Sequence, residues 1–239
     1  MTADGWTSAV RHQLSLGRLL PLGGPRDGAW ITEAAAEAVL RRAARGVEGV
    51  RTGALRIAAA DPAGVYEPAV PPPPSALPPG PLRVTADIAA SSSEPLPTAA
   101  SRLRTALAAA AADRLGLMVS EVDLRVTALL DEEPEPEPEA VRPGPEPQHV
   151  AAAQHGDEAR VTVAALSVPG VTRLTDVVGR AVRIEERQHT TALPHRHARV
   201  EIAVSAHHRA VEVARGVRAV VSEALRDHPT VAVVVTAVE

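Results

Sequence analysis

The sequence predicts an α+β fold made of two similar units, each with helices packed on one face of a small, mainly antiparallel sheet. An acidic, proline-rich run over residues 131–148 divides the chain of 239 residues into two parts, each of about 100 residues and long enough to bury its own core. Each part alternates segments of helical periodicity with segments that are apolar at every second position. The order helix, strand, strand, helix, strand occurs in both parts, which indicates an internal duplication.

Residues 1–27 form an N-terminal leader, and its amphipathic segment 6–20 is expected to pack against its own domain; binding to a membrane surface is the alternative. Residues 32–48 then have the periodicity of a helix with one apolar face. Thr32 is the expected N-cap because its hydroxyl can accept from the first turn. Gly49 suits the left-handed exit from a helix.

The rest of the first unit alternates strands with one more helix. A strand is expected near residues 55–59. The proline-rich stretch 68–81 is expected to be an exposed loop inserted between strands, because proline cannot donate to a ladder. Residues 82–88 are apolar at every second position and predict a strand. A helix over 97–115, stopped by a glycine, and a strand over 122–128 complete the unit.

The second unit covers residues 149–239 and repeats this order with shorter loops. Its first helix ends in a Val-Pro-Gly-Val turn at residues 168–171, which matches the Gly-Val turn of the first unit. The expected elements are a helix over 157–167, strands over 181–188 and 199–205, a helix over 210–227 and a strand over 231–238.

Charge is concentrated in the run 131–148, which holds seven acidic residues and one arginine. Alternating proline and glutamate favour an extended spacer, although a docking ligand for a basic or polyproline-reading partner is an alternative. Outside this run 24 basic residues face 22 acidic ones. This near-neutral balance argues against a nucleic-acid surface.

Composition excludes several classes of function. The chain has no cysteine, which rules out disulfides, thiolate metal sites and a cysteine nucleophile. All basic residues are arginine, a bias typical of high-GC actinobacterial coding. The first residues lack the pattern of a signal peptide, and the longest run of small apolar residues, 106–112, is too short to span a bilayer. We expect a cytoplasmic protein.

Several positions of the first unit follow the order of one known family. Ile31 ends a strand before the helix that closes in the Gly-Val turn, Pro97 opens the second helix, and the turn Leu115-Gly116-Leu117 precedes the strand Val122–Val126. Through these positions residues 28–130 resemble the alkaline shock protein family of Gram-positive bacteria. Residues 149–239 resemble it more loosely, as a diverged second copy.

The two copies depart from the family pattern in their turns. Ser91-Ser92-Ser93 replaces the glycine after the middle strand, and His228-Pro229-Thr230 replaces the Gly-Leu turn in the second copy. The resemblance implies a non-enzymatic protein of the envelope stress response. Such proteins lie in the cytoplasm, often beneath the membrane through a membrane-anchored partner, and self-associate. The family has no catalytic or cofactor-binding residues to transfer.

Histidine gives the one alternative chemistry, because eight of the nine histidines follow residue 148. His195 and His197 precede the strand 199–205 and His207-His208 follow it, so the two groups are separated by roughly 33 Å, the length of about ten strand residues. His189 could meet the first group across a hairpin. A small-ligand or metal-binding regulatory module, or a pH sensor, is therefore the alternative function, but no metal ligand is assigned.

Hydrolytic or phosphate chemistry finds little support. The serines at 91–93 lie in a polar turn without a nucleophile-elbow pattern. Gly23-Gly24 is followed by a proline, which does not form a phosphate-binding loop. We therefore expect no enzyme and no cofactor.

Overall fold

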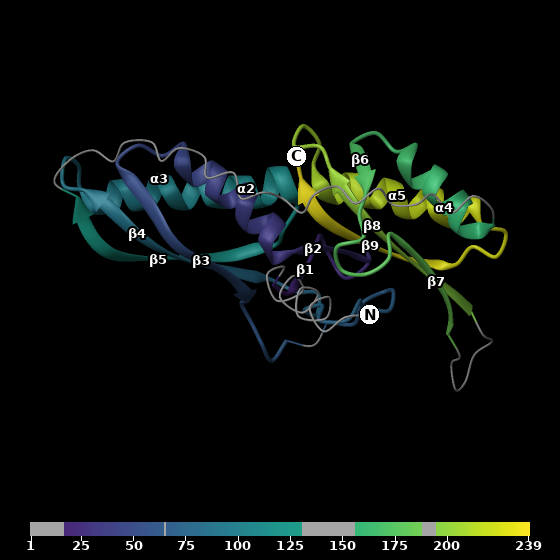
Figure 1. Cartoon of the computed structure of the whole chain (residues 1–239). Coiled ribbons are helices and arrows are strands. Elements are labelled where there is room, and N and C mark those ends of the chain that lie inside the picture. Colours follow the sequence, from purple (N-terminus) through teal and green to yellow (C-terminus); the bar gives the residue numbers. More distant parts are fainter. Residues whose placement is uncertain (1–16, 65, 131–155, 188–194) are drawn as a thin grey trace, which may run out of the picture.

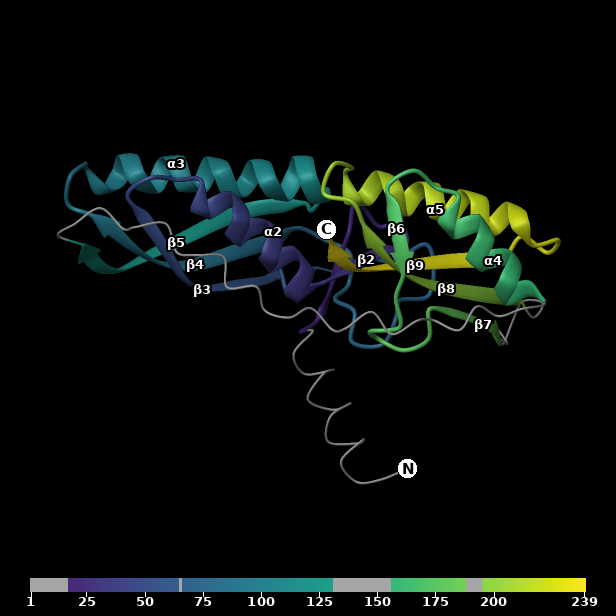
Figure 2. The same ribbon diagram turned by 45° about the horizontal axis from the view of Figure 1, so that its top comes forward.

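The computed structural model describes residues 17–64, 66–130, 156–187 and 195–239. The chain forms two sheets that lie side by side in an elongated molecule, and the helices cover one side of both (Figure 1). Figure 2 shows the same layers from a second direction, with α3 and α5 lying roughly end to end. The α+β class predicted from the sequence is confirmed.

The first unit contains β1 to β5 and two helices, the second of which continues as a π-helix. Its elements are β1 (Leu19–Pro21), β2 (Ala29–Thr32), α2 (Glu33–Arg45), β3 (Val50–Ala59), β4 (Leu82–Ser91), α3 (Leu96–Ala109), the π-helix η1 (Ala110–Leu115) and β5 (Val119–Leu130). The elements of the second unit are α4 (Asp157–Leu166), β6 (Val171–Leu174), β7 (Val182–Arg187), β8 (His195–Val204), α5 (Ala210–Ala224) and β9 (Thr230–Val238).

The two sheets share a pattern of strand pairing. In the first sheet β3 lies antiparallel to β4, and β4 lies parallel to β5. In the second sheet β6 lies antiparallel to β8, and β8 lies parallel to β9. In both units a helix connects the two parallel strands, as a parallel connection requires. Each sheet is mixed, and the second unit has one strand more between its helices than the predicted order gives.

The two units share one element that the sequence does not reveal. Strand β2, which precedes α2, pairs in parallel with β9 at the end of the chain and places Trp30 opposite Val234. Strand β1 pairs with β2 in turn. Residues 19–21, expected to belong to an amphipathic leader, are therefore a strand at the edge of the second sheet. Residues 1–16 lie outside the described part, and the boundaries of the predicted domains stay predictions.

Local capping chemistry explains where the helices of the first unit begin and end. The hydroxyl of Thr32 accepts from the amide of Ala35 at 3.3 Å, which confirms the predicted N-cap. Gly49 has a positive φ of 74°, as expected for the turn after α2. Gly116 ends η1 with a φ of 87°, and its amide donates to Ala111. A Cβ at this glycine would lie 2.3 Å from a methyl carbon of Val211 on α5.

The second unit differs from expectation in three places. The short strand β6 had not been predicted, and it pairs with β8 beside the expected β7. Helix α5 ends at Ala224 because Leu225 adopts an extended conformation, so the predicted end at residue 227 is wrong. Strand β8 begins at His195, four residues earlier than the predicted strand.

One hydrophobic core runs through both units on the helical side of the sheets. It consists of leucine, isoleucine, valine and alanine side chains such as Leu40, Leu103 and Ile202, all fully buried. A smaller cluster lies on the other side of the second sheet. It contains Leu19, Trp30, Val70, Ala232 and Val234.

The proline-rich loop contributes to this smaller cluster, so the prediction that it is simply exposed is wrong. Val70 is only 4% exposed. The amide of Ala69 donates to Pro25 at 2.9 Å, and the amide of Leu77 donates to Leu19 at 2.8 Å. Loop and β1 therefore hold each other in place across the second face of the sheet.

Candidate functional site

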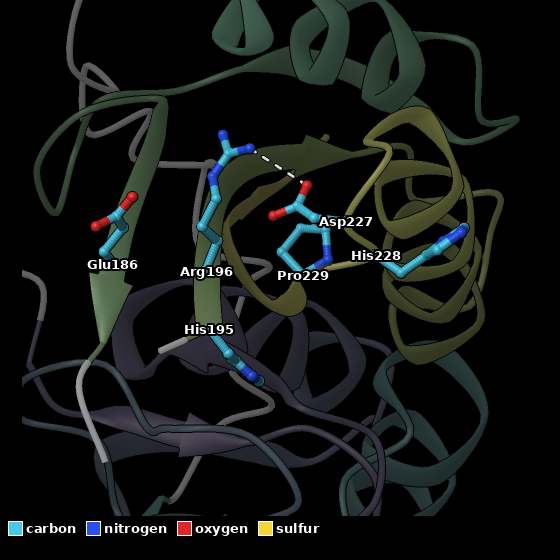
Figure 3. A pocket seen from close by; sticks show the side chains of 6 residues that line it. All are labelled: Glu186, His195, Arg196, Asp227, His228 and Pro229. Carbon is cyan, nitrogen blue, oxygen red and sulfur yellow. Dashed lines mark hydrogen bonds and ion pairs between the residues drawn. The ribbon is translucent and has the colours of Figure 1, made fainter. Parts of the chain in front are cut away.

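A polar pocket lies where β7, the start of β8 and the turn between α5 and β9 meet (Figure 3). Its volume is about 280 Å³. The lining residues are Glu186, His195, Arg196, Asp227, His228 and Pro229.

Arg196 supplies the positive charge of this pocket, and two aspartates bind it. Its guanidinium donates to Asp157 at 2.7 Å and to Asp227 at 3.2 Å. These carboxylates raise the pKa of Arg196, and the hydrogen bond that Arg196 donates to Asp157 contributes most. Since the cation is already paired twice, the pocket joins α4, β8 and the end of α5 rather than presenting an unpaired charge to a ligand.

The histidines divide between the two ends of β8, as the sequence predicts. At the beginning of the strand, His195 Nε2 and His197 Nδ1 lie 3.0 Å and 2.8 Å from the hydroxyl oxygen of Thr230. His207 and His208 follow the other end of the strand. In the described part of the chain no group of three or more histidine, aspartate or glutamate side chains could hold a metal ion. His189 lies outside the described residues.

The serine turn at residues 91–93 forms a local network. The hydroxyls of Ser91 and Ser93 lie 2.9 Å apart, and the amide of Ser93 donates to Ser91. The amide of Ser92 donates to the carbonyl of Leu130. These bonds close the end of the first sheet and agree with the interpretation of a polar turn.

A buried carboxylate on β8 is the feature that sequence reasoning missed. Glu201 is fully buried on the sheet face opposite α5. Its Oε2 accepts from the amide of Val178 at 2.8 Å, and its Oε1 lies 3.4 Å from Arg199 Nη2. Burial raises the pKa of Glu201 from 4.5 to about 7, against the lowering effect of the Val178 amide and Arg199.

The segment between β6 and β7 covers this carboxylate. The segment after β6 donates the Val178 amide to it, and Val178 also packs on the small cluster that contains Trp30 and Val70. The backbone of Glu201 is bonded on both sides, to Thr175 and to Ala181. A signal was present in the sequence, because the period of two places Arg199 and Glu201 on one face. Nothing in that pattern reveals that loops bury the face.

Besides Tyr66, the exposed large apolar side chains of the described chain lie in two regions. Met118, Val126 and Leu129, which are 42–59% exposed, lie on or next to β5. Val163 and Leu166, which are 70% and 48% exposed, lie on α4. Strand β5 pairs with β4 along one edge, and no strand of the described residues pairs with its other edge. An exposed edge with apolar side chains is a site where another strand can add.

Comparisons with known protein families, with characterised proteins and with solved structures found no match. Among the described residues no helix combines the length and the apolar character that crossing a membrane requires. The polar pocket, the buried carboxylate and the two exposed apolar regions are therefore the features from which a function can be inferred.

Proposed function

We propose that this chain is a non-enzymatic scaffold or interaction protein that resembles the envelope (alkaline) stress proteins. It acts by self-association or by binding a membrane-anchored protein from the cytoplasmic side, and it does not bind nucleic acid. The observation that carries the proposal is the open edge of β5, where Val126 and Leu129 are 42% and 59% exposed. A strand edge of this kind pairs readily with another chain.

The charged groups of the described part support the same function. Arg196 in the pocket is paired with two aspartates, and Arg215 on α5 is paired with Asp27 at 2.8 Å. Such pairs hold elements of the scaffold together. Covering exposed apolar surface with a protein partner, by contrast, is favourable.

Sedimentation velocity over a range of protein concentrations tests self-association directly. We expect the weight-average sedimentation coefficient to rise with concentration for the full chain. A coefficient that stays at the value for a monomer would refute self-association and leave the membrane-anchored partner as the remaining form of the proposal.

A small-ligand or metal-binding regulatory module is the second candidate, favoured by the 280 Å³ pocket with His195 and His228 in its lining. Metal analysis of protein purified without a histidine tag tests it. A stoichiometric amount of zinc or nickel would support this module, and its absence together with concentration-dependent assembly would support the scaffold.

A further inference from the structure

The repeat makes β5 and β9 equivalent strands with different surroundings. Each is the last strand of its unit and lies parallel to the strand before the connecting helix. The outer edge of β9 is occupied by β2. The corresponding edge of β5 has no partner strand in residues 17–64, 66–130, 156–187 and 195–239. The first sheet therefore lacks a neighbour that the second sheet has.

We infer that β5 pairs edge to edge with β5 of a second copy of this chain, antiparallel about a two-fold axis at Leu124. The inference rests on the proposed self-association and names its surface. A closed two-fold dimer requires one surface that is complementary to itself. The sequence of β5 has this property.

The charges on β5 select the register. With Leu124 on the axis, Asp123 lies opposite Arg125 of the partner subunit, and Arg125 lies opposite the partner's Asp123. Both side chains are available to a partner. Asp123 is 61% exposed and lies 3.5 Å from Arg83. Arg125 is 78% exposed and lies 3.9 Å from Asp87. With the axis at residue 123, Arg125 lies opposite the partner's Glu121, but Asp123 then lies opposite the partner's Asp123. With the axis at residue 125, Arg125 lies opposite the partner's Arg125. Only the axis at Leu124 gives opposite-charge pairs and no like-charge pair. Like charges directly opposite are unfavourable.

The apolar side chains on the other face of β5 agree with this register. Leu124 meets the partner's Leu124, and Val122 meets the partner's Val126. Val126 is 42% exposed in the single chain and becomes more buried in the dimer, which is favourable. Aliphatic β-branched and leucine pairs across strands stabilise a sheet.

The backbone of β5 also fits. Arg104 Nε donates to the carbonyl of Val122 at 3.3 Å, so this carbonyl can be reached from outside the ladder with β4. In a strand the backbone groups of alternate residues point to the same edge, which places those of Leu124 and Val126 at the outer edge as well. Opposite residues in the inferred register are therefore the ones that can exchange hydrogen bonds.

A charge-exchange series in the full chain tests the register. Asp123→Arg and Arg125→Asp each create two like-charge contacts per dimer, and each should weaken dimerisation by about tenfold or more. The double variant, Asp123→Arg with Arg125→Asp, restores both opposite-charge contacts and should recover most of the affinity. Glu67→Arg, at an exposed position just before the proline-rich loop, is the control for the change in net charge.

Cross-linking tests the axis independently, because the chain has no cysteine. Leu124→Cys should give a disulfide-linked dimer on mild oxidation, since directly opposite residues lie within about 5.5 Å of each other. Thr127→Cys should not, because its opposite residue is six positions away from the partner's residue 127.

The outcomes separate this inference from the proposed function. A monomer at every concentration, with no cross-link at 124, overturns both self-association and the edge pairing. A dimer that Asp123→Arg does not weaken, or that cross-links equally through 124 and 127, overturns the edge pairing alone. A double variant as weak as the single ones, yet folded by circular dichroism, also overturns the proposed register.

Discussion

Replacing Glu201 with glutamine should remove a loss of stability that the wild-type protein undergoes as the pH rises. The carboxyl is buried between β8 and the segment after β6, and burial raises its pKa from 4.5 to about 7. The groups that face it are Arg199 on its own strand, the amides of Val178 and Gly179, and Asp176. Arg199 and the amides favour the charged form, whereas burial and Asp176 oppose it.

The direction of the effect follows from the two pKa values. Below pH 4.5 the carboxyl carries a proton in both the folded and the unfolded chain, so it contributes no pH dependence. Between pH 4.5 and about 7 the folded chain holds a proton that the unfolded chain has lost, and the free energy of unfolding falls as the pH rises. Above about pH 7 the carboxyl is ionised in both the folded and the unfolded chain, and the folded chain bears the full cost of burying the charge.

The size of the effect is set by this difference in pKa. A pKa that rises from 4.5 to about 7 corresponds to about 3 kcal/mol, because each unit is worth about 1.36 kcal/mol. Relative to Glu201→Gln, the wild-type protein should therefore lose about 3 kcal/mol of unfolding free energy between pH 4.5 and pH 8. The glutamine oxygen can keep the bond from the Val178 amide, so the variant should fold.

Urea denaturation at several pH values, followed by circular dichroism, measures this difference. The other titrating groups are shared by both proteins and cancel in the comparison. Glu223→Gln on α5 is a control for the loss of one carboxylate, because Glu223 is exposed. Parallel pH profiles for the wild type and Glu201→Gln would refute the assignment of a raised pKa to this carboxyl.

Three further substitutions test the contacts that join the two units. Gly116→Ala should lower the free energy of unfolding by about 2 kcal/mol, because a left-handed residue other than glycine costs about 1–2 kcal/mol and the new Cβ meets α5; Gly24→Ala, where φ is not positive and the nearest atom is 3.9 Å away, should be close to neutral in the same urea titration. Thr32→Ala should lower the free energy of unfolding by about 1 kcal/mol because the N-cap of α2 is lost. Thr32→Ser keeps a capping hydroxyl and should retain most of this stability in thermal denaturation. Asp27→Asn should cost about 1 kcal/mol at pH 7, since Arg215 lowers the pKa of Asp27; this cost should disappear as the pH falls below 3.8, the ordinary pKa of the group.

Local sequence signals predicted the helices and most of the strands of this fold. Thr32, Gly49 and Gly116 act through bonds and backbone angles within a few residues of each position, so the sequence alone is sufficient to place them. Strand β6 was missed because its four residues, Val171–Leu174, are too short for an alternating pattern to be recognised. Helix α5 ends early because Leu225 turns to an extended conformation within an apolar periodicity that continues past it.

Contacts between distant segments could not be predicted in this way. Trp30 and Val234 are separated by most of the chain, and their pairing depends on the register of two strands from different units. The alternation along β8 places Glu201 on the face opposite Val200 and Ile202, which lie in the core. The segment between β6 and β7 covers it through the amide of Val178, and the path of such a segment leaves no periodic signal in the sequence.

Strands β5 and β9 occupy equivalent places in the two units but differ in burial and in composition. Strand β9 contains the run Val231–Val235, which is buried on both faces, as expected for a strand with neighbours on each side and layers above and below. Strand β5 alternates valine and leucine with Glu121, Asp123 and Arg125, and charges of this kind keep an open edge soluble in the single chain. Their arrangement around Leu124 adds a second property, because only this antiparallel register pairs opposite charges without placing like charges opposite each other. The second unit completes its sheet with β2 of the same chain, and the first unit is suited to complete its sheet with another copy.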